Sequence, residues 1–253
     1  MPTLAPSLKI ENTLARIELR RPLQANRLDQ GDLTVLQEHL ATVNVDSQVR
    51  VLLLSASGKH FCSGFNIGQV HQNTESAGAL FESLTNAWEQ ARPVTIAAIN
   101  GGVYGGATDL ALACDFRLGV PSCDMFVPAT QLGLHFYRGG MQRYVTRLGL
   151  NIAKRVLLAG ERLDATAMLS CGFLDQIVQT DELHSRALAL AQSIAGLAPL
   201  ALLPMKQHLN NIARGTLDLE DLAADIARAD ASKDLAEGTQ AWLEKRAPVF
   251  TGR

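Results

Sequence analysis

Two stretches, VLLLSASGKHFCSGFNI at residues 51–67 and AAINGGVYGGATDLALACDFRLG at residues 97–119, decide the fold. In each, a short apolar run leads into a loop that is rich in glycine and other small residues. An apolar run without polar alternation is typical of a strand that is buried on both faces. We therefore predict an α/β core in which two glycine-rich loops, each following a buried strand, lie side by side.

The segments around these stretches complete the pattern. A hairpin is predicted over residues 8–19, and a helix capped by Asp29 or Asp32 is predicted to run to about Val43. The other strands are expected at residues 51–54, 94–99, 116–120, 125–127 and 174–178. The other helices are expected at residues 80–91, 107–114, 139–148, 151–159, 164–171, 183–196, 198–213, 217–230 and 233–245.

The length of the chain suits one large domain with a smaller appendage. Its 253 residues suffice to bury a large core. The predicted strands all precede residue 180, and the last fifty residues are helical in pattern. We therefore predict an α/β core at residues 1–196 and a helical C-terminal region at residues 197–253.

Composition and charge exclude several classes of protein. The chain is 47% hydrophobic and 19% charged, which is a globular composition. A net charge of -2 gives no general attraction to nucleic acid or to an anionic membrane, so neither is predicted as a partner. No apolar run approaches the ~20 residues of a membrane span, and no signal-peptide pattern is seen. The four cysteines form no C-x-x-C pair, so we predict no metal site, reduced thiols and a cytoplasmic location.

The loops at residues 59–67 and 100–109 are candidates to hold a ligand oxygen. Glycine lets backbone N–H groups approach a ligand, and a helix that starts near Gly106 directs free N–H donors at it. Two such loops side by side can place one N–H each on a single oxygen, which makes an oxyanion hole. A plain turn is the alternative for either loop, whereas a dinucleotide-binding turn needs a glycine where Val103 stands.

Five segments, in order and spacing, resemble the crotonase (enoyl-CoA hydratase/isomerase) superfamily. Besides the two loops, Arg21-Pro22 followed by Asn26 resembles the first coenzyme A loop of that family. LGLHFYRGGMQRYVTRLG at residues 132–149 resembles the loop and helix that come next, and EGTQAWLEKRAPVF at residues 237–250 resembles the C-terminal helix. The resemblance implies a crotonase-type spiral of repeated β-β-α units with a helical C-terminal region. It also implies a homotrimer or a dimer of trimers.

The resemblance further implies an enzyme that acts on an acyl-CoA thioester. Phe65 and Gly106 would donate backbone N–H groups to the thioester oxygen and so stabilise an enolate. Coenzyme A would enter as part of the substrate, and no permanently bound cofactor is implied. The residues implied in substrate or coenzyme A binding are Arg21, Asn26, Arg27, Gly64, Ile67, Gly105, Trp242 and Lys245. For the basic residues among them, a solvated surface charge is the alternative.

Two positions depart from the hydratase pattern, in which two glutamates surround one water. Asp109 stands where the first glutamate would be, and Ala129 stands where the second would be. Asp109, His135 and Tyr137 are therefore the candidates for proton transfer. The alternatives are an aspartate that stabilises the start of a helix and a histidine that is merely exposed. Hydration itself is open, because the second acid or base is missing.

The chain also resembles the methylmalonyl-CoA decarboxylase branch of the superfamily, around Leu132-Gly133 and in the C-terminal segment. That reaction needs only an enolate stabilised after a carboxylate has left, so a missing glutamate is no handicap. Those enzymes carry histidine where this chain has Phe65, and tyrosine where it has Phe136. A hydratase/isomerase-family reaction is thus predicted, with a malonyl-type decarboxylase and a catalytically silent acyl-CoA binder as alternatives.

Overall fold

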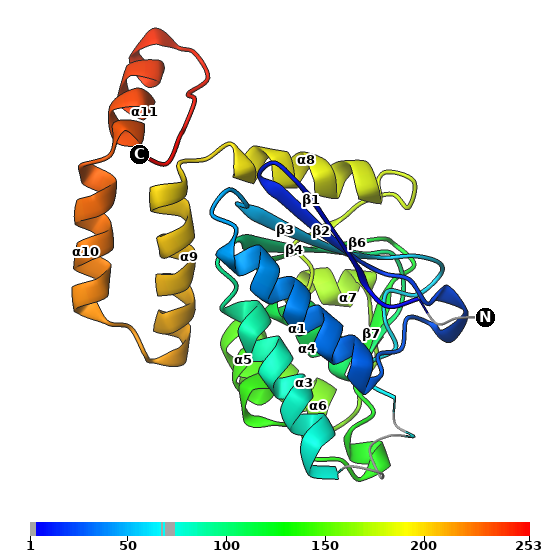
Figure 1. Ribbon diagram of the computed structural model, residues 1–253. Helices are drawn as coiled ribbons and strands as arrows, with labels where there is room; N and C mark the ends of the chain where they lie inside the picture. Colours follow the sequence, from blue (N-terminus) through cyan, green and yellow to red (C-terminus); the bar gives the residue numbers. More distant parts are fainter. Residues whose placement is uncertain (1–3, 67, 69–73) are drawn as a thin grey trace.

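A six-stranded sheet forms the centre of the protein in this computed structural model, which describes residues 4–66, 68 and 74–253 (Figure 1). The strand order is β1-β2-β3-β4-β6-β9. The first two strands form an antiparallel hairpin, and every other neighbouring pair is parallel. The strands are β1 Ser7–Glu11, β2 Leu14–Leu19, β3 Val51–Ala56, β4 Val94–Ile99, β6 Phe116–Gly119 and β9 Gln176–Ile177.

A second, smaller sheet lies beside the first and turns the chain into a spiral. It contains β5 Val103–Tyr104, β7 Asp124–Phe126 and β8 Leu163–Asp164, in that order. The chain runs from β4 of the large sheet to β5 of the small one and then into helix α4; it repeats this path from β6 to β7 and then α5. The repeated unit is therefore β-β-α, as predicted. The two-residue strands β5 and β8 were not predicted.

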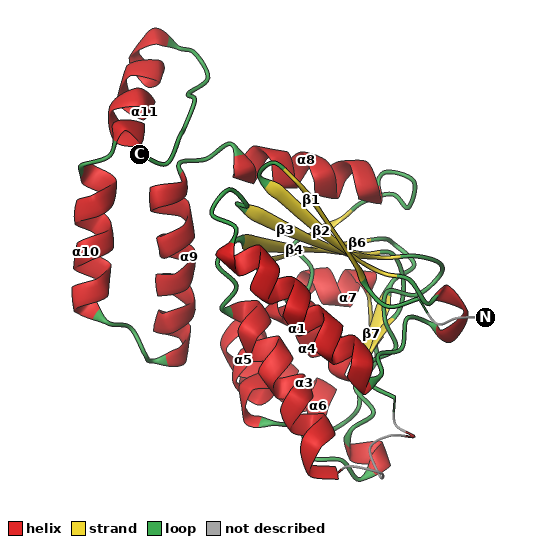
Figure 2. Cartoon of the chain, in the orientation of Figure 1, coloured by secondary structure: helices red, strands yellow, loops and turns green. Residues whose placement is uncertain are grey.

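Helices enclose the large sheet on both faces. Helix α8 packs on β3 and β4 from one side, and α1, α3 and α4 lie on the other (Figure 2). The helices of this part are α1 Gln30–Val45, α3 Thr74–Glu89, α4 Gly106–Ala113, α5 Arg138–Leu148, α6 Leu150–Leu157, α7 Ala165–Ser170 and α8 Leu183–Ala195. Asp29 is the N-cap of α1. The backbone N–H of Asp29 donates a hydrogen bond to the Asp32 carboxylate at 2.8 Å. Helix α3 begins six residues earlier than predicted.

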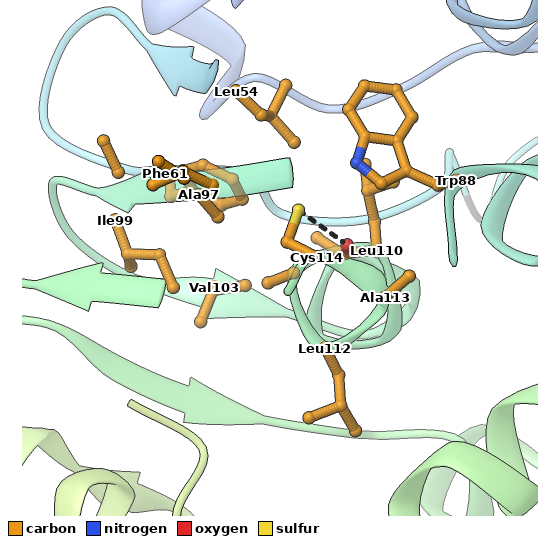
Figure 3. Close-up of a cluster of buried hydrophobic side chains, with 14 of the residues drawn as sticks. Leu54, Phe61, Trp88, Ala97, Ile99, Val103, Leu110, Leu112, Ala113 and Cys114 are labelled. Atoms are coloured by element: carbon orange, nitrogen blue, oxygen red, sulfur yellow. Dashed lines mark hydrogen bonds between the residues drawn. The ribbon is translucent and has the colours of Figure 1, made fainter. Parts of the chain in front are cut away.

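The core packs tightly around α4. All six residues of β4 are buried, and so are seven of the eight residues of α4, from Ala107 to Ala113. Figure 3 shows how Leu110 and Cys114 of this region face Trp88 and the apolar side chains that come from the sheet. Fully burying one Leu or Phe side chain stabilises a fold by roughly 1.5–3 kcal/mol, so α4 is held firmly. The first residue of α4, Gly106, is therefore fixed in space.

Three helices, α9 Pro199–Arg214, α10 Leu219–Asp230 and α11 Lys233–Glu244, extend from the core (Figure 1). Helix α10 packs along α9. An ion pair between Lys206 and Asp115, 2.8 Å apart, ties α9 to the core. In the described part of the chain no single helix is long and apolar enough to cross a membrane, although α8 and α9 together, bent by 109°, have the length and composition of a broken span.

Candidate active site

Backbone hydrogen bonds hold the two glycine-rich loops side by side. Cys62 and Val103 form an isolated parallel bridge, and the Tyr104 N–H donates to the Cys62 carbonyl at 2.9 Å. On its other side the first loop is fastened to Leu28, which donates to the Gly64 carbonyl and accepts from the Asn66 N–H, each at 2.9 Å. The backbone around residue 65 is thus fixed between Leu28 and the second loop.

Two backbone N–H groups at this junction have no acceptor among the residues that the structure describes. The neighbours of Phe65 use their hydrogen bonds on Leu28, so the Phe65 N–H, which alternates with them, points away from that strand. Gly106 is the first residue of α4, so its N–H has no acceptor within the helix. Neither N–H donates to another residue in the described ranges. A free N–H at a helix N-terminus, such as that of Gly106, is a favourable donor to an oxygen that carries negative charge.

Glycine at residue 64 lets the loops approach so closely. Its φ is +88°, in the left-handed region that side chains avoid. A Cβ built there would lie 2.7 Å from the Tyr104 carbonyl oxygen and 3.2 Å from the Gly106 nitrogen. Gly105, the N-cap of α4, also has a positive φ, of 56°. The predicted binding residues Gly64 and Gly105 therefore shape the loops with their backbone alone.

A cavity of about 240 Å³ opens next to the two free donors. Phe65 and Gly106 both lie in its wall, and the rest of the wall is mainly apolar. The other residues that line it are Ser63, Gly78, Phe81, Gly105, Val127, Pro128, Ala129, Leu132, Leu134, His135, Phe136 and Tyr137. Ser63, His135 and Tyr137 are its polar side chains. No carboxylate side chain is among the described residues of the wall, and a methyl group stands at Ala129.

Asp109 lies behind the cavity wall, fully buried in an ion pair. Its Oδ1 accepts a hydrogen bond from Arg143 Nε at 2.8 Å, and its Oδ2 accepts one from Arg143 Nη2 at 2.6 Å. The Tyr137 hydroxyl donates to the same Oδ2 at 2.7 Å. Asp109 is 0% exposed and is not part of the cavity wall, whereas Tyr137 is part of it. The predicted candidates Asp109 and Tyr137 are thus in contact, but only the tyrosine meets the cavity.

Arg143 extends this network toward the C-terminal helices. Its guanidinium also donates to Thr85 Oγ1 at 2.8 Å and to Asn86 Oδ1 at 2.9 Å on α3. Glu89 lies 3.3 Å from Arg143 and pairs in turn with Arg214 of α9. Arg143 was not among the residues predicted from the sequence. The one sequence feature that could have indicated its burial is helical spacing, because Gly140, Arg143 and Tyr144 lie on the same, buried face of α5.

The charges of the network follow from its pKa shifts. Burial, and after it the negative charge of Asp109, raise the pKa of Tyr137 well above its ordinary value. Burial lowers the pKa of Arg143, but the hydrogen bonds and the charge of Asp109 outweigh that effect and raise it. At neutral pH the network therefore holds a neutral phenol and a guanidinium cation.

His135 is exposed at the mouth of the cavity. Its Nδ1 lies 2.7 Å from the Phe136 carbonyl oxygen, so Nδ1 carries the proton and Nε2 is free to accept one in the neutral ring. Phe136 stacks on Tyr137 with ring centroids 4.8 Å apart, and both rings line the cavity. No group of three or more His, Cys, Asp or Glu in the described ranges is arranged to hold a metal ion.

The predicted coenzyme A residues near the N-terminus have different surroundings. Arg21 directs its guanidinium at Asp29 and Asp32, at 2.8 and 2.7 Å, and only 13% of its side chain is exposed. Asn26 is buried, and its amide donates to the Ser57 and His60 carbonyls, so it holds its own loop against the start of the first glycine-rich loop. Arg27 is more open, with 41% of its side chain exposed. Its Nε lies 3.9 Å from Asp29 Oδ1, and its side chain is the most exposed of the three.

The remaining predicted binding residues lie at the other end of the chain. Trp242 is 84% exposed on α11, and Lys245 is the exposed C-cap of that helix. Neither lines the cavity at Phe65 and Gly106. Ile67 lies outside the described residues.

Comparisons with known proteins agree with this arrangement. The sequence profile of the enoyl-CoA hydratase/isomerase family matches residues 9–253. The enoyl-CoA hydratase domain-containing protein 2, mitochondrial, of Mus musculus is 34% identical over 95% of this chain and 85% of its own. Carnitinyl-CoA dehydratase of Proteus mirabilis is 31% identical over 97% of this chain and 98% of its own. An enoyl-CoA hydratase structure from Bacillus anthracis, 30% identical, covers 99% of this chain and 100% of its own with a TM-score of 0.92.

A spiral of β-β-α units thus surrounds an apolar cavity, and its wall contains two backbone N–H groups that have no acceptor among the described residues. With the profile match and the structural likeness, the chain belongs to the enoyl-CoA hydratase/isomerase family of the crotonase superfamily. The predicted fold class is confirmed.

Proposed function

We propose that this protein catalyses a reaction of an acyl-CoA thioester through an enolate that is stabilised by the Phe65 and Gly106 N–H groups. The observation that carries the proposal is this pair of free donors in the wall of an apolar cavity. The thioester oxygen would accept both hydrogen bonds, which strengthen as negative charge develops on it. Relatives such as carnitinyl-CoA dehydratase, whose name specifies a coenzyme A thioester, support this substrate class.

The wall of the cavity favours a reaction that needs no carboxylate beside the substrate. Ala129 stands at the second glutamate position of the hydratases, and the Asp109 carboxylate is engaged by Arg143. Ordinary hydration, in which two glutamates handle one water, therefore lacks both of its groups in the described wall. An enolate also forms when a C–C bond breaks and carbon dioxide leaves.

Decarboxylation of a malonyl-type thioester is accordingly the second candidate. The electron pair of the breaking C–C bond passes into the thioester and gives the enolate, and a proton then adds to carbon. A wall without carboxylates favours this substrate, because it does not repel the leaving carboxylate. His135 and Tyr137 are the titratable side chains of the described wall.

The test combines a substrate panel with a matched pair of variants. Crotonyl-CoA is followed by its conjugated-thioester absorbance, and methylmalonyl-CoA by release of carbon dioxide. Gly106→Pro removes the N–H at a helix position that tolerates proline, and Gly106→Ala keeps the N–H. Both variants add a Cβ near the Phe81 ring, which lies 2.9 Å from that position. The proposal expects Gly106→Pro to lower kcat roughly 10²–10³-fold relative to Gly106→Ala.

Two outcomes contradict the proposal. Equal rates for the two variants would exclude a catalytic role for the Gly106 N–H. Tight binding of an acyl-CoA without turnover of any member of the panel would favour a silent binder.

Three further parts of the proposal stay predictions. Arg21, Arg27, Trp242 and Lys245 would contact coenzyme A, the last two from a neighbouring copy of the chain in a trimer. No permanently bound cofactor is proposed. A cytoplasmic location also stays a prediction, since several relatives carry mitochondrial in their names.

A further inference from the structure

Tyr137 lies between the acyl cavity and the Asp109 carboxylate, which is not part of the cavity wall. The ring lies in the wall, and the hydroxyl donates to Asp109 Oδ2 at 2.7 Å. A phenol has one proton, and here that proton is directed at the carboxylate. Both carboxylate oxygens of Asp109 also accept hydrogen bonds from Arg143. The order from cavity to core is therefore Tyr137, Asp109, Arg143.

Within the acyl-CoA reaction proposed above, on which this inference rests, we propose that Asp109 and Arg143 are positioning residues. They act through Tyr137 and hold its ring as a fixed wall of the acyl cavity. The Asp109 carboxylate takes no part in proton transfer. This differs from the role predicted from the sequence, in which Asp109 was an acid or base.

The geometry of the ion pair explains why Asp109 is unsuited to proton transfer. A bidentate arginine occupies one lone pair on each oxygen, and the tyrosine hydroxyl takes another on Oδ2. Protonating the carboxylate would break this arrangement and leave Arg143, which is 1% exposed, without its partner. In this arrangement the carboxylate acts as the acceptor of three hydrogen bonds.

Other contacts fix the same loop, which is what a positioning role requires. The Gly139 N–H donates to Glu82 Oε1 at 2.7 Å, so the backbone just after Tyr137 is tied to α3. A Cβ built on Gly140 would lie 2.4 Å from the Phe136 ring and 2.9 Å from the Tyr137 ring, so α5 presses against both. These contacts fix the backbone of the loop, and the hydrogen bond to Asp109 fixes the orientation of the Tyr137 ring.

The first experiment measures binding, so it does not depend on turnover. The dissociation constants of coenzyme A and of butyryl-CoA, which has a saturated acyl chain, are measured by calorimetry. The dissociation constant of coenzyme A divided by that of butyryl-CoA reports how much the acyl group strengthens binding. Tyr137→Phe and Asp109→Asn are each expected to reduce that ratio about threefold to tenfold, the equivalent of one hydrogen bond, with coenzyme A binding unchanged. The double variant is expected to lose no more than either single one, because both substitutions act on the same Tyr137–Asp109 hydrogen bond: one removes its donor and the other removes the charge of its acceptor.

The matched control is Tyr144→Phe. Tyr144 is a buried tyrosine of α5 whose hydroxyl donates to Thr108 Oγ1 of α4 at 2.6 Å, but it does not line the cavity. Its variant loses a hydrogen bond between the same two helices and is expected to keep the wild-type ratio. Tyr137→Phe leaves the Asp109–Arg143 pair intact, so it tests the inference even where Asp109→Asn does not fold.

The second experiment uses whichever substrate the wild-type protein turns over. For Asp109→Asn the inference expects a higher KM, a kcat within a few fold of wild type and an unchanged pH profile of kcat. A proton-transfer role predicts instead a loss of kcat of roughly 10²–10⁴-fold and the disappearance of one limb of that profile. That result, or an unchanged binding ratio in Tyr137→Phe, overturns the inference. A wild-type protein that binds neither coenzyme A nor butyryl-CoA overturns the proposed function, and the inference with it.

Discussion

The four thiols differ in reactivity because their surroundings differ. Burial raises the pKa of Cys62 and of Cys114 to about 12, and that of Cys123 to about 11. At pH 8 these groups are therefore protonated, and the thiolate that attacks an alkylating reagent is nearly absent. Cys171 is the partly exposed one. We expect iodoacetamide at pH 8 to modify Cys171 alone in the folded protein, as read by peptide mass spectrometry.

Unfolding in guanidinium provides the comparison for this experiment. All four cysteines should then react at similar rates, since burial is lost. Rapid modification of Cys62 in the folded protein would show that the first glycine-rich loop opens to solvent.

Glycine is required at residue 64 for two reasons that can be separated. A side chain there meets both a left-handed φ and the Tyr104 carbonyl oxygen at 2.7 Å. Gly215, the C-cap of α9, has a φ of +67° but nothing within 4 Å of its built Cβ. Gly215→Ala should cost about 1–2 kcal/mol of unfolding free energy from strain alone. Gly64→Ala should cost clearly more in urea denaturation, and equal losses would mean that the clash is relieved cheaply.

At the scale of elements, the Asp109–Arg143 pair joins α4 to α5 in the core. Removing one partner leaves the other charge buried, which typically costs about 3–5 kcal/mol, whereas an apolar pair of similar volume is often neutral. We therefore expect Arg143→Met to lower the unfolding free energy by about 3–5 kcal/mol. The double variant Asp109→Leu/Arg143→Met should recover most of that loss.

Urea denaturation of the two single variants and the double variant gives the coupling between the partners. Glu89 also faces Arg143, at 3.3 Å, and it keeps Arg147 and Arg214 as partners when Arg143 is replaced. If the double variant is as unstable as Arg143→Met, the lost unfolding free energy comes from the buried charge of Glu89 and not from that of Asp109.

The elements that the sequence predicts well are those with a local signal. Strand β4 is a continuous apolar run and is buried at all six positions, so the run and the strand coincide. Strands β5 and β8 have two residues each and exist because β7 pairs with both, which no local pattern reveals. The start of α3 was placed six residues late, because its first turn carries no apolar periodicity.

The same distinction holds for the candidate active site. The free N–H groups of Phe65 and Gly106 depend on glycine loops that follow buried strands, and the sequence displays both features. The surroundings of Asp109 depend on Arg143, 34 residues further on, and on how α5 packs against α4. The two glycine-rich loops are therefore predictable from local pattern, whereas the surroundings of a side chain depend on partners that only tertiary packing supplies.

At the scale of the whole molecule, the C-terminal helices carry several large apolar side chains that are exposed in the single chain. On α9, Met205, Leu209 and Ile212 are 59%, 61% and 57% exposed, and their spacing places them on one face. An apolar stripe of this kind marks an interaction surface. We expect the 27.3 kDa chain to form homotrimers, or dimers of trimers, in solution, and Leu209→Glu to shift it toward the monomer.

Sedimentation velocity at micromolar concentration measures this directly. Val45→Glu is the control, because Val45 is 83% exposed at the end of α1, outside the α9 stripe, and its variant should keep the wild-type assembly. If Trp242 and Lys245 contact coenzyme A from a neighbouring copy, Leu209→Glu should also weaken coenzyme A binding, whereas Val45→Glu should not. A wild-type monomer would refute the predicted trimer, and the binding measurement would then show whether one chain binds coenzyme A alone.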